Sequence, residues 1–162
     1  MGDRHRMEGR HGAIVAPDDS FIEFPDGIPG FVEETSWVVV GGTDSPLAWL
    51  QSTDTPSVAL PVTIPWAFHW SFEVKVSDEE LAQIELDRAE DVEVLAVVNV
   101  PREPKRATIN LFAPIIVNRR LMLGRQVTNL MPGYSCRDPL VARAVGRPVA
   151  IHGWDFPMAV RA

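Results

Sequence analysis

Cysteine, long apolar runs and basic charge are all scarce in this sequence. Its 162 residues include one cysteine, Cys136, which excludes an internal disulfide and a cage of cysteines around a metal. No apolar run reaches the roughly 18 residues that a membrane-spanning helix needs. Aspartate and glutamate outnumber lysine and arginine by 22 to 15, and the net charge of −7 argues against direct binding of nucleic acid. Met1 to His11 is charged rather than apolar, so we expect no secretory signal, and a single cysteine fits a reducing cytoplasm.

The sequence also lacks the short motifs that mark common active sites. It has no Gly-x-Ser-x-Gly, no His-Glu-x-x-His, no Walker loop and no Cys-x-x-Cys. A catalytic thiol needs a neighbouring base, and the sequence fixes no histidine beside Cys136. We therefore predict no catalytic residue, no metal site and no cofactor, and we expect a protein that is not an enzyme.

What the sequence does contain is a series of short apolar segments that alternate or run as strands. A hydrophobic fraction of 46% and a charged fraction of 23% are ordinary for one globular domain. Strands at short spacing with little helix predict a mainly β fold, either a compact, partly open β-barrel or a two-sheet sandwich with one or two short helices. We expect a flexible N-terminal tail at residues 1–17, a β domain at 18–140 and a C-terminal extension at 141–162, with a short helix near 139–145.

The central stretch of the predicted domain is Thr108 to Asn118. Two apolar runs are broken there by Pro114, which donates no backbone hydrogen bond and so interrupts a strand ladder. Asn110 and Asn118 bracket the break, where an amide side chain can satisfy free backbone groups. We interpret Asn110, Pro114 and Asn118 as structural. Further strands are predicted at Ser20–Phe24, Trp37–Val40, Leu47–Gln51, Ser57–Thr63, Trp66–Val76, Val92–Val100 and Leu121–Asn129.

Two features are candidates for a partner-binding surface. The first is the loop Phe24 to Phe31, in which Gly27 and Gly30 allow a positive φ, together with Gln51. Shaped loops on a rigid β scaffold often carry function, although the same residues can serve only to build the fold.

The second candidate is the acidic segment, residues 78–93, which follows a predicted helix cap at Ser77. It contains eight carboxylates and one basic residue, and we single out Glu85, Asp87 and Glu90. Residues 1–93 carry a net charge of −14 and residues 94–162 one of +7, so a charged partner can be steered unless the halves interleave in space.

The aromatic residues Trp66, Phe68, Trp70 and Phe72 leave an alternative open. Dense aromatics can stack nucleic-acid bases, and the second half of the chain is basic, so a small RNA-binding barrel is one alternative. Sites of that kind interleave aromatics with arginine or lysine, and only Lys75 is near, so we favour core packing. A barrel with a small-molecule pocket is the other alternative.

The ordered motifs resemble those of the flagellar assembly factor FliW family from about Ser20 to Leu140. The motifs that carry the resemblance are Phe-Pro-Asp-Gly-Ile-Pro-Gly-Phe at 24–31, Leu50-Gln51-Ser52, Ile-Asn-Leu-Phe-Ala-Pro-Ile-Ile-Val-Asn at 109–118, Gln126-Val127 and Tyr134. The chain departs from the family pattern after the fourth predicted strand, where Ile64-Pro65 and His69-Trp70 replace an Asp-Pro and an acidic-aromatic pair. It also continues further after Leu140 than the resemblance covers.

The resemblance implies a cytoplasmic, non-enzymatic regulator with two protein partners. Members of this family bind flagellin, and they bind and antagonise the carbon storage regulator, a small RNA-binding translational repressor. The two partners compete, so export of flagellin frees the protein to relieve repression. The resemblance implies no metal, no nucleotide and no directly bound RNA, and the lack of a long apolar run predicts no membrane partner.

Overall fold

The computed structural model describes residues 2–41, 45–140 and 158–161. Strands dominate, as the sequence predicts. In chain order the elements are β1 (Arg4–Gly9), β2 (Gly12–Pro17), η1 (Asp18–Ser20), β3 (Ile22–Glu23), β4 (Ser36–Gly41), β5 (Leu47–Ser52), β6 (Ala59–Thr63), η2 (Pro65–Ala67), α1 (Asp78–Gln83), η3 (Ala89–Asp91), β7 (Val92–Asn99), η4 (Pro104–Arg106), β8 (Thr108–Ile109), β9 (Ile115–Asn118), β10 (Leu123–Gln126), β11 (Asp138–Pro139) and β12 (Val160–Arg161).

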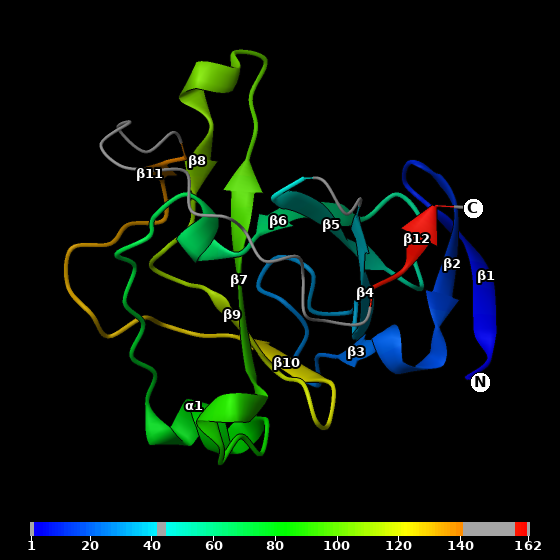
Figure 1. Ribbon diagram of the computed structural model, residues 1–162, viewed down its shortest axis with the longest axis horizontal. Coiled ribbons are helices and arrows are strands. Elements are labelled where there is room, and N and C mark those ends of the chain that lie inside the picture. The colour runs from blue at the N-terminus through cyan, green and yellow to red at the C-terminus, as the bar shows by residue number, and fades with distance from the viewer. Residues whose placement is uncertain (1, 42–44, 141–157, 162) are drawn as a thin grey trace.

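The main sheet closes on itself as a small barrel. Its hydrogen-bonded order runs β7-β6-β5-β4-β3-β10-β9, and β9 pairs with β7 again, which completes the ring. The parallel junction between β3 and β10 is narrow, with Leu123 opposite Glu23 as its registered pair. β8 and β11 extend from the far end of β7 as a side branch (Figure 1). The predicted mainly β, barrel-like fold is confirmed.

Strand β4 shows why continuous apolar runs occur in this chain. Trp37 and Val39 point into the barrel, whereas Val38 and Val40 point outward into a second core. All four are at most 5% exposed, because both faces of the strand are covered. A strand buried on both sides needs apolar residues at every position, and burial of each such side chain contributes roughly 1.5–3 kcal/mol.

The core outside β4 is covered by a three-stranded sheet that the sequence did not predict. β1 and β2 form an antiparallel hairpin with Gly9 opposite Gly12, and β12 pairs with the other edge of β2. The expected flexible tail at residues 1–17 is therefore wrong for Arg4–Pro17. The polar sequence of β1 misled the prediction, because its stability comes from β2 rather than from its own burial. Figure 1 shows this sheet at the opposite end of the molecule from α1.

Two antiparallel pairings confirm the predicted role of Thr108 to Asn118. β8 and β9 both pair with β7, on either side of the break at Pro114. Side chains alternate between two cores: Ile115 and Val117 face the barrel interior, and Ile116 faces a core on the other side of β7 and β9. β10 then begins at Leu123, later than predicted, after a turn that includes Met122 at φ 54°.

The predicted strand at Trp66–Val76 is wrong. Residues 65–67 form the 3-10 helix η2, and the chain from Trp70 to Val76 pairs with no strand. Its backbone groups are bonded singly instead: the Lys75 N–H donates to Asn129 Oδ1 at 3.1 Å, and the Glu73 N–H to the Tyr134 hydroxyl at 2.9 Å. The alternating side chains still pack on the core outside β7.

The C-terminal extension is described only in part. Asp138–Pro139 forms the short strand β11 against β8, so the predicted helix does not begin there, and its remainder lies outside the described residues. Ala159 is fully buried beside Val40, and its N–H donates to the Val39 carbonyl at 2.9 Å. Residues 158–161 therefore contact both sheets, because Ala159 bonds to β4 of the barrel and β12 pairs with β2 of the outer sheet.

Candidate functional site

The predicted loop from Phe24 to Phe31 is a tightly held turn. Phe24 is 0% exposed, and the half-buried Phe31 lies edge-on to Trp37 with ring centroids 6.3 Å apart. Gly27 has φ 66°, and a Cβ there would lie 2.5 Å from the Val32 backbone, so no other residue fits. Gly30, at φ 90°, faces open space and is exposed. The structure thus moves Phe24 out of the predicted binding surface.

Gln51 is also interior, at 3% exposure. Its amide nitrogen donates to the Pro56 carbonyl at 3.0 Å and to the Val58 carbonyl at 3.1 Å. Its Oε1 accepts from the Arg10 N–H at 2.8 Å. These bonds join the barrel to the turn of the N-terminal hairpin. Gln51 therefore has a structural contact at each end of its amide and offers no surface to a partner.

Glu34 is a half-buried residue whose hydrogen-bond network the sequence reasoning missed. Thr55 Oγ1 donates to its Oε1 at 2.6 Å, and the Ser52 hydroxyl donates to its other oxygen. These two hydroxyls, Ser52 first, lower the pKa of Glu34 against a smaller opposing effect of burial. The carboxylate thereby ties the segment before β4 to the β5–β6 turn. Ser52 lies inside a quoted motif, but its partner cannot be found from spacing.

The side chains of three asparagines hydrogen-bond to backbone groups at chain turns. Asn118, at 1% exposure, donates from Nδ2 to the Ile84 carbonyl at 2.9 Å and to that of Glu85 at 3.1 Å. Its Oδ1 accepts from the Arg120 and Leu121 N–H groups at 3.1 and 3.3 Å.

The other two asparagines close nearby corners. Asn110 Oδ1 accepts from the Ala113 N–H at 2.9 Å, beside the buried Pro114. Asn129, missed from sequence, donates to the Glu73 carbonyl at 3.0 Å and holds the segment before α1. Asn110 and Asn118 thus bond to the backbone of the chain itself, and Pro114 is buried beside Asn110.

Helix α1 begins and ends by identifiable caps. Ser77 Oγ accepts from the Glu80 N–H at 3.3 Å, as predicted. At the other end, the N–H of Glu85 donates to the Ala82 carbonyl and that of Leu86 to the Leu81 carbonyl, the two bonds of a Schellman motif. Glu85 occupies the position with φ 53° that usually takes glycine, and Asn118 donates to the carbonyls of Ile84 and Glu85.

The acidic segment, residues 78–93, is only partly neutralised. Arginines of the basic half of the chain reach some of its carboxylates: Arg125 lies 3.7 Å from Glu80, Arg120 lies 3.5 Å from Asp91, and Arg119 lies 3.9 Å from Glu93. The two halves therefore interleave here, which reduces the predicted charge separation.

Other carboxylates of the segment point to solvent. Glu85 and Asp87 are exposed and form no ion pair within 4.0 Å in the described part of the chain. Glu90 lies 3.7 Å from Arg88, and both side chains are more than half exposed, so this pair adds little and leaves the region acidic.

An apolar cavity lies beside this acidic surface, between α1, the segment 66–76 and the outer face of β7. We call it the α1 pocket; its volume is about 370 Å³, and Trp66, Val76, Leu81, Leu86, Val92 and Ile116 are among its lining residues. Asp87, Arg88 and Ala89 also line it, so charge borders an apolar interior.

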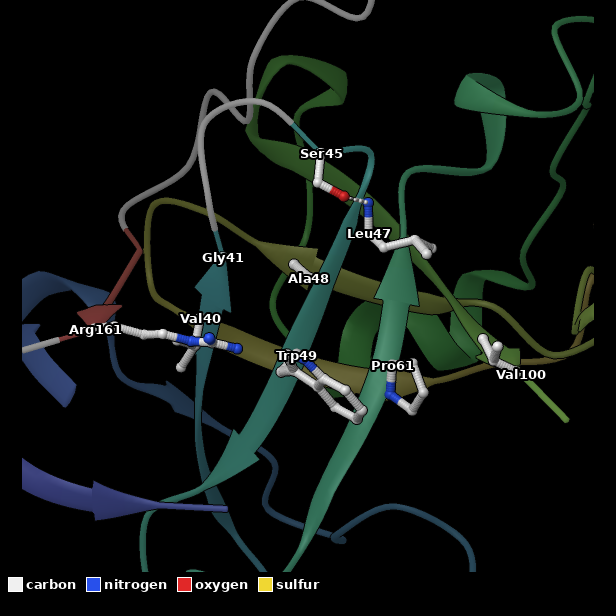
Figure 2. A pocket seen from close by; sticks show the side chains of 9 residues that line it. All are labelled: Val40, Gly41, Ser45, Leu47, Ala48, Trp49, Pro61, Val100 and Arg161. Carbon is white, nitrogen blue, oxygen red and sulfur yellow. Dashed lines mark hydrogen bonds between the residues drawn. The ribbon is translucent and has the colours of Figure 1, made fainter. Parts of the chain in front are cut away.

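A larger cavity, of about 790 Å³, lies on the outside of the barrel. Figure 2 shows lining residues from β4, β5 and β6, with Trp49 and Pro61 side by side and Arg161 from β12. The Ser45 hydroxyl there accepts from the Leu47 N–H at 3.1 Å, so it is already used. Converging polar groups, which a small-molecule site would need, are not seen among the described lining residues.

The aromatic run does not form a stacking platform. Trp66 and Phe72 pack edge-to-face with centroids 5.4 Å apart, and Phe72 also contacts Tyr134. Trp70 is 67% exposed, and it takes no part in the ring contacts of Trp66, Phe72 and Tyr134. Core packing, favoured from the sequence, describes Trp66 and Phe72 better than base stacking does.

The fold and these surfaces define a class: a small β-barrel whose exposed features are an acidic helix, shaped loops and an apolar pocket. No helix in the described residues is long and apolar enough to cross a membrane. The model of the FliW protein family matches residues 6–140, so the chain belongs to the FliW family. The match includes most of the N-terminal hairpin, which the sequence reasoning had placed outside the domain.

Individual relatives agree with this assignment. The flagellar assembly factor FliW of Bacillus licheniformis is 34% identical over 135 residues, covering 83% of this chain and 94% of the relative. That of Bacillus subtilis is 33% identical over 131 residues, covering 80% of this chain and 92% of the relative. A crystal structure of the flagellar assembly factor FliW superposes with a TM-score of 0.78 at 29% identity, covering 87% of this chain and all of the other, 100%. The chain therefore shares its family, its fold and most of its length with proteins named flagellar assembly factor FliW.

Proposed function

We propose that the protein is a cytoplasmic, non-enzymatic regulator that binds flagellin, and that binds and antagonises the carbon storage regulator. The two partners compete for it. Free flagellin keeps the protein away from the repressor, and export of flagellin releases it, so that translation resumes. Family membership supports this proposal, since the relatives that match most of the chain are named flagellar assembly factors.

The observation that carries the repressor half of the proposal is the exposed acidic surface at Glu85, Asp87 and Glu90. A repressor that binds RNA presents basic surface, and opposite charges on two proteins raise the rate of encounter. Glu85 and Asp87 have no internal ion-pair partner within 4.0 Å in the described structure, so their field is directed to solvent.

Charge reversal tests this. The triple variant Glu85→Lys, Asp87→Lys, Glu90→Lys should slow association with the repressor by about tenfold or more at low salt, and should flatten its salt dependence. Stopped-flow or biosensor kinetics at several salt concentrations measure both quantities.

A matched control has the same change in net charge elsewhere. Asp19, Glu23 and Glu33 are exposed and lie outside the acidic segment. Their reversal to lysine should alter association far less. Equal rates for the wild type and the Glu85 triple variant at low salt would exclude the acidic surface as the docking site.

An electrophoretic assay with flagellin leader RNA and the protein alone should show no shift, and a shift would favour direct RNA binding.

A further inference from the structure

The α1 pocket is unfilled apolar space next to the surface to which we assign the repressor. Leu81 and Leu86 approach it from α1 and the turn after it, Trp66 and Val76 from the preceding segment, and Val92 from β7. At about 370 Å³ it lies within the range of pockets that hold ligands or anchor side chains. In interfaces, such pockets near the centre accept the few large residues that carry most of the binding energy.

We propose that the α1 pocket receives a large apolar side chain from a basic segment of the partner that the acidic surface attracts. This inference rests on the proposed function and adds to it the place where binding energy is gained. The charge around the pocket selects the occupant. Asp87 and Arg88 line the pocket, Glu85 precedes Leu86, and Glu90 follows Ala89. The carboxylates therefore outnumber the one cation at this border, and an apolar residue flanked by lysine or arginine matches both the interior and the border.

The interior and the border act on different rate constants. Exposed carboxylates at a border mainly change the association rate and its salt dependence. An apolar anchor that enters a preformed pocket mainly changes the dissociation rate. The two contributions can therefore be separated by kinetics on variants that alter one and leave the other.

A pair of alanines allows a matched test. Ala89 is exposed and lines the α1 pocket, whereas Ala82 is exposed on α1 and does not line it. Ala89→Phe places a bulky side chain at the pocket without changing charge. With the carbon storage regulator as the probe, Ala89→Phe should speed dissociation by about tenfold or more and leave the salt dependence of association unchanged. Ala82→Phe should behave as the wild type does.

The outcomes are distinguishable. If the wild type binds neither the carbon storage regulator nor flagellin, the proposed function fails, and this inference fails with it. If the wild type binds the regulator and Ala89→Phe binds equally well, only the pocket inference is overturned. Loss of flagellin binding with intact repressor binding would also overturn it, since the pocket would then serve the other partner.

A second measurement on the unmodified chain covers the case in which Ala89→Phe does not fold. The methyl NMR signals of Leu81, Leu86 and Val92 should shift when the regulator is added. Those of Val38, in the separate core between β4 and the N-terminal hairpin, should not. Unchanged signals at the three pocket residues in a saturated complex would overturn the proposal.

Discussion

Replacing Asn118 by alanine should destabilise the protein more than replacing Asn110, the other asparagine of Thr108 to Asn118, by alanine. The side chain is 1% exposed and has four hydrogen bonds, of 2.9, 3.1, 3.1 and 3.3 Å. One protein hydrogen bond contributes about 1 kcal/mol net, and a buried group left without a partner costs about 1–3 kcal/mol. Ile84 is buried, so its carbonyl cannot turn to bulk water, whereas the other partners lie nearer the surface.

These terms give an expected loss of roughly 2–4 kcal/mol in the free energy of unfolding for Asn118→Ala. Asn110→Ala is the control, because Asn110 Oδ1 accepts one bond, from the Ala113 N–H at 2.9 Å, and is only partly buried. It should lose about 1 kcal/mol. Equilibrium unfolding in urea, followed by tryptophan fluorescence, measures both. A loss for Asn118→Ala no greater than that for Asn110→Ala would refute the reasoning.

Two further predictions concern the barrel. Gly124→Ala should lower the free energy of unfolding by about 1–3 kcal/mol, because the added Cβ would lie 2.5 Å from the ring of the fully buried Phe24. In urea unfolding, the double variant with Phe24→Leu should recover part of this loss. Losses of the two single variants that simply add in the double variant would contradict the contact. Glu34, whose pKa is lowered by two hydroxyl donors, stabilises the fold above its unfolded pKa of about 4.3, and this contribution disappears as pH falls through the lower folded pKa. Glu34→Gln should therefore be less stable than the wild type at pH 7 and equal to it in strong acid, with Glu33→Gln unchanged throughout; a stability difference independent of pH would refute the assignment.

The sequence predicted best those elements whose burial is uniform. β4, β7 and β9 are covered on both faces, so their apolar runs identify them without knowledge of their neighbours. The N-terminal hairpin was not found, because the residues of β1 are mostly exposed. Its order depends on β2, which follows it directly, and on β12 and Gln51, which lie far away in the sequence. The alternation at Trp66–Val76 was real, but it reports packing on a core rather than membership of a sheet.

The candidate site also has features that the sequence predicts and features that need the structure. Exposure of Glu85, Asp87 and Glu90 follows from a dense run of charges and could be predicted. Burial of Phe24 and Gln51 could not, because their partners are Gly124 in one case and the turn after β1 in the other. The α1 pocket needed the structure, since it is built from four separate segments.

The competition between partners tests the central claim most directly. The purified chain is held with the carbon storage regulator at a fixed concentration, and flagellin is added in steps while the fraction of bound regulator is followed. We predict capture of the regulator without flagellin, and its stoichiometric release as flagellin saturates the chain. Failure to capture either protein, or a complex with the regulator that flagellin leaves intact at saturation, would contradict regulation by competing proteins on the outside of this barrel.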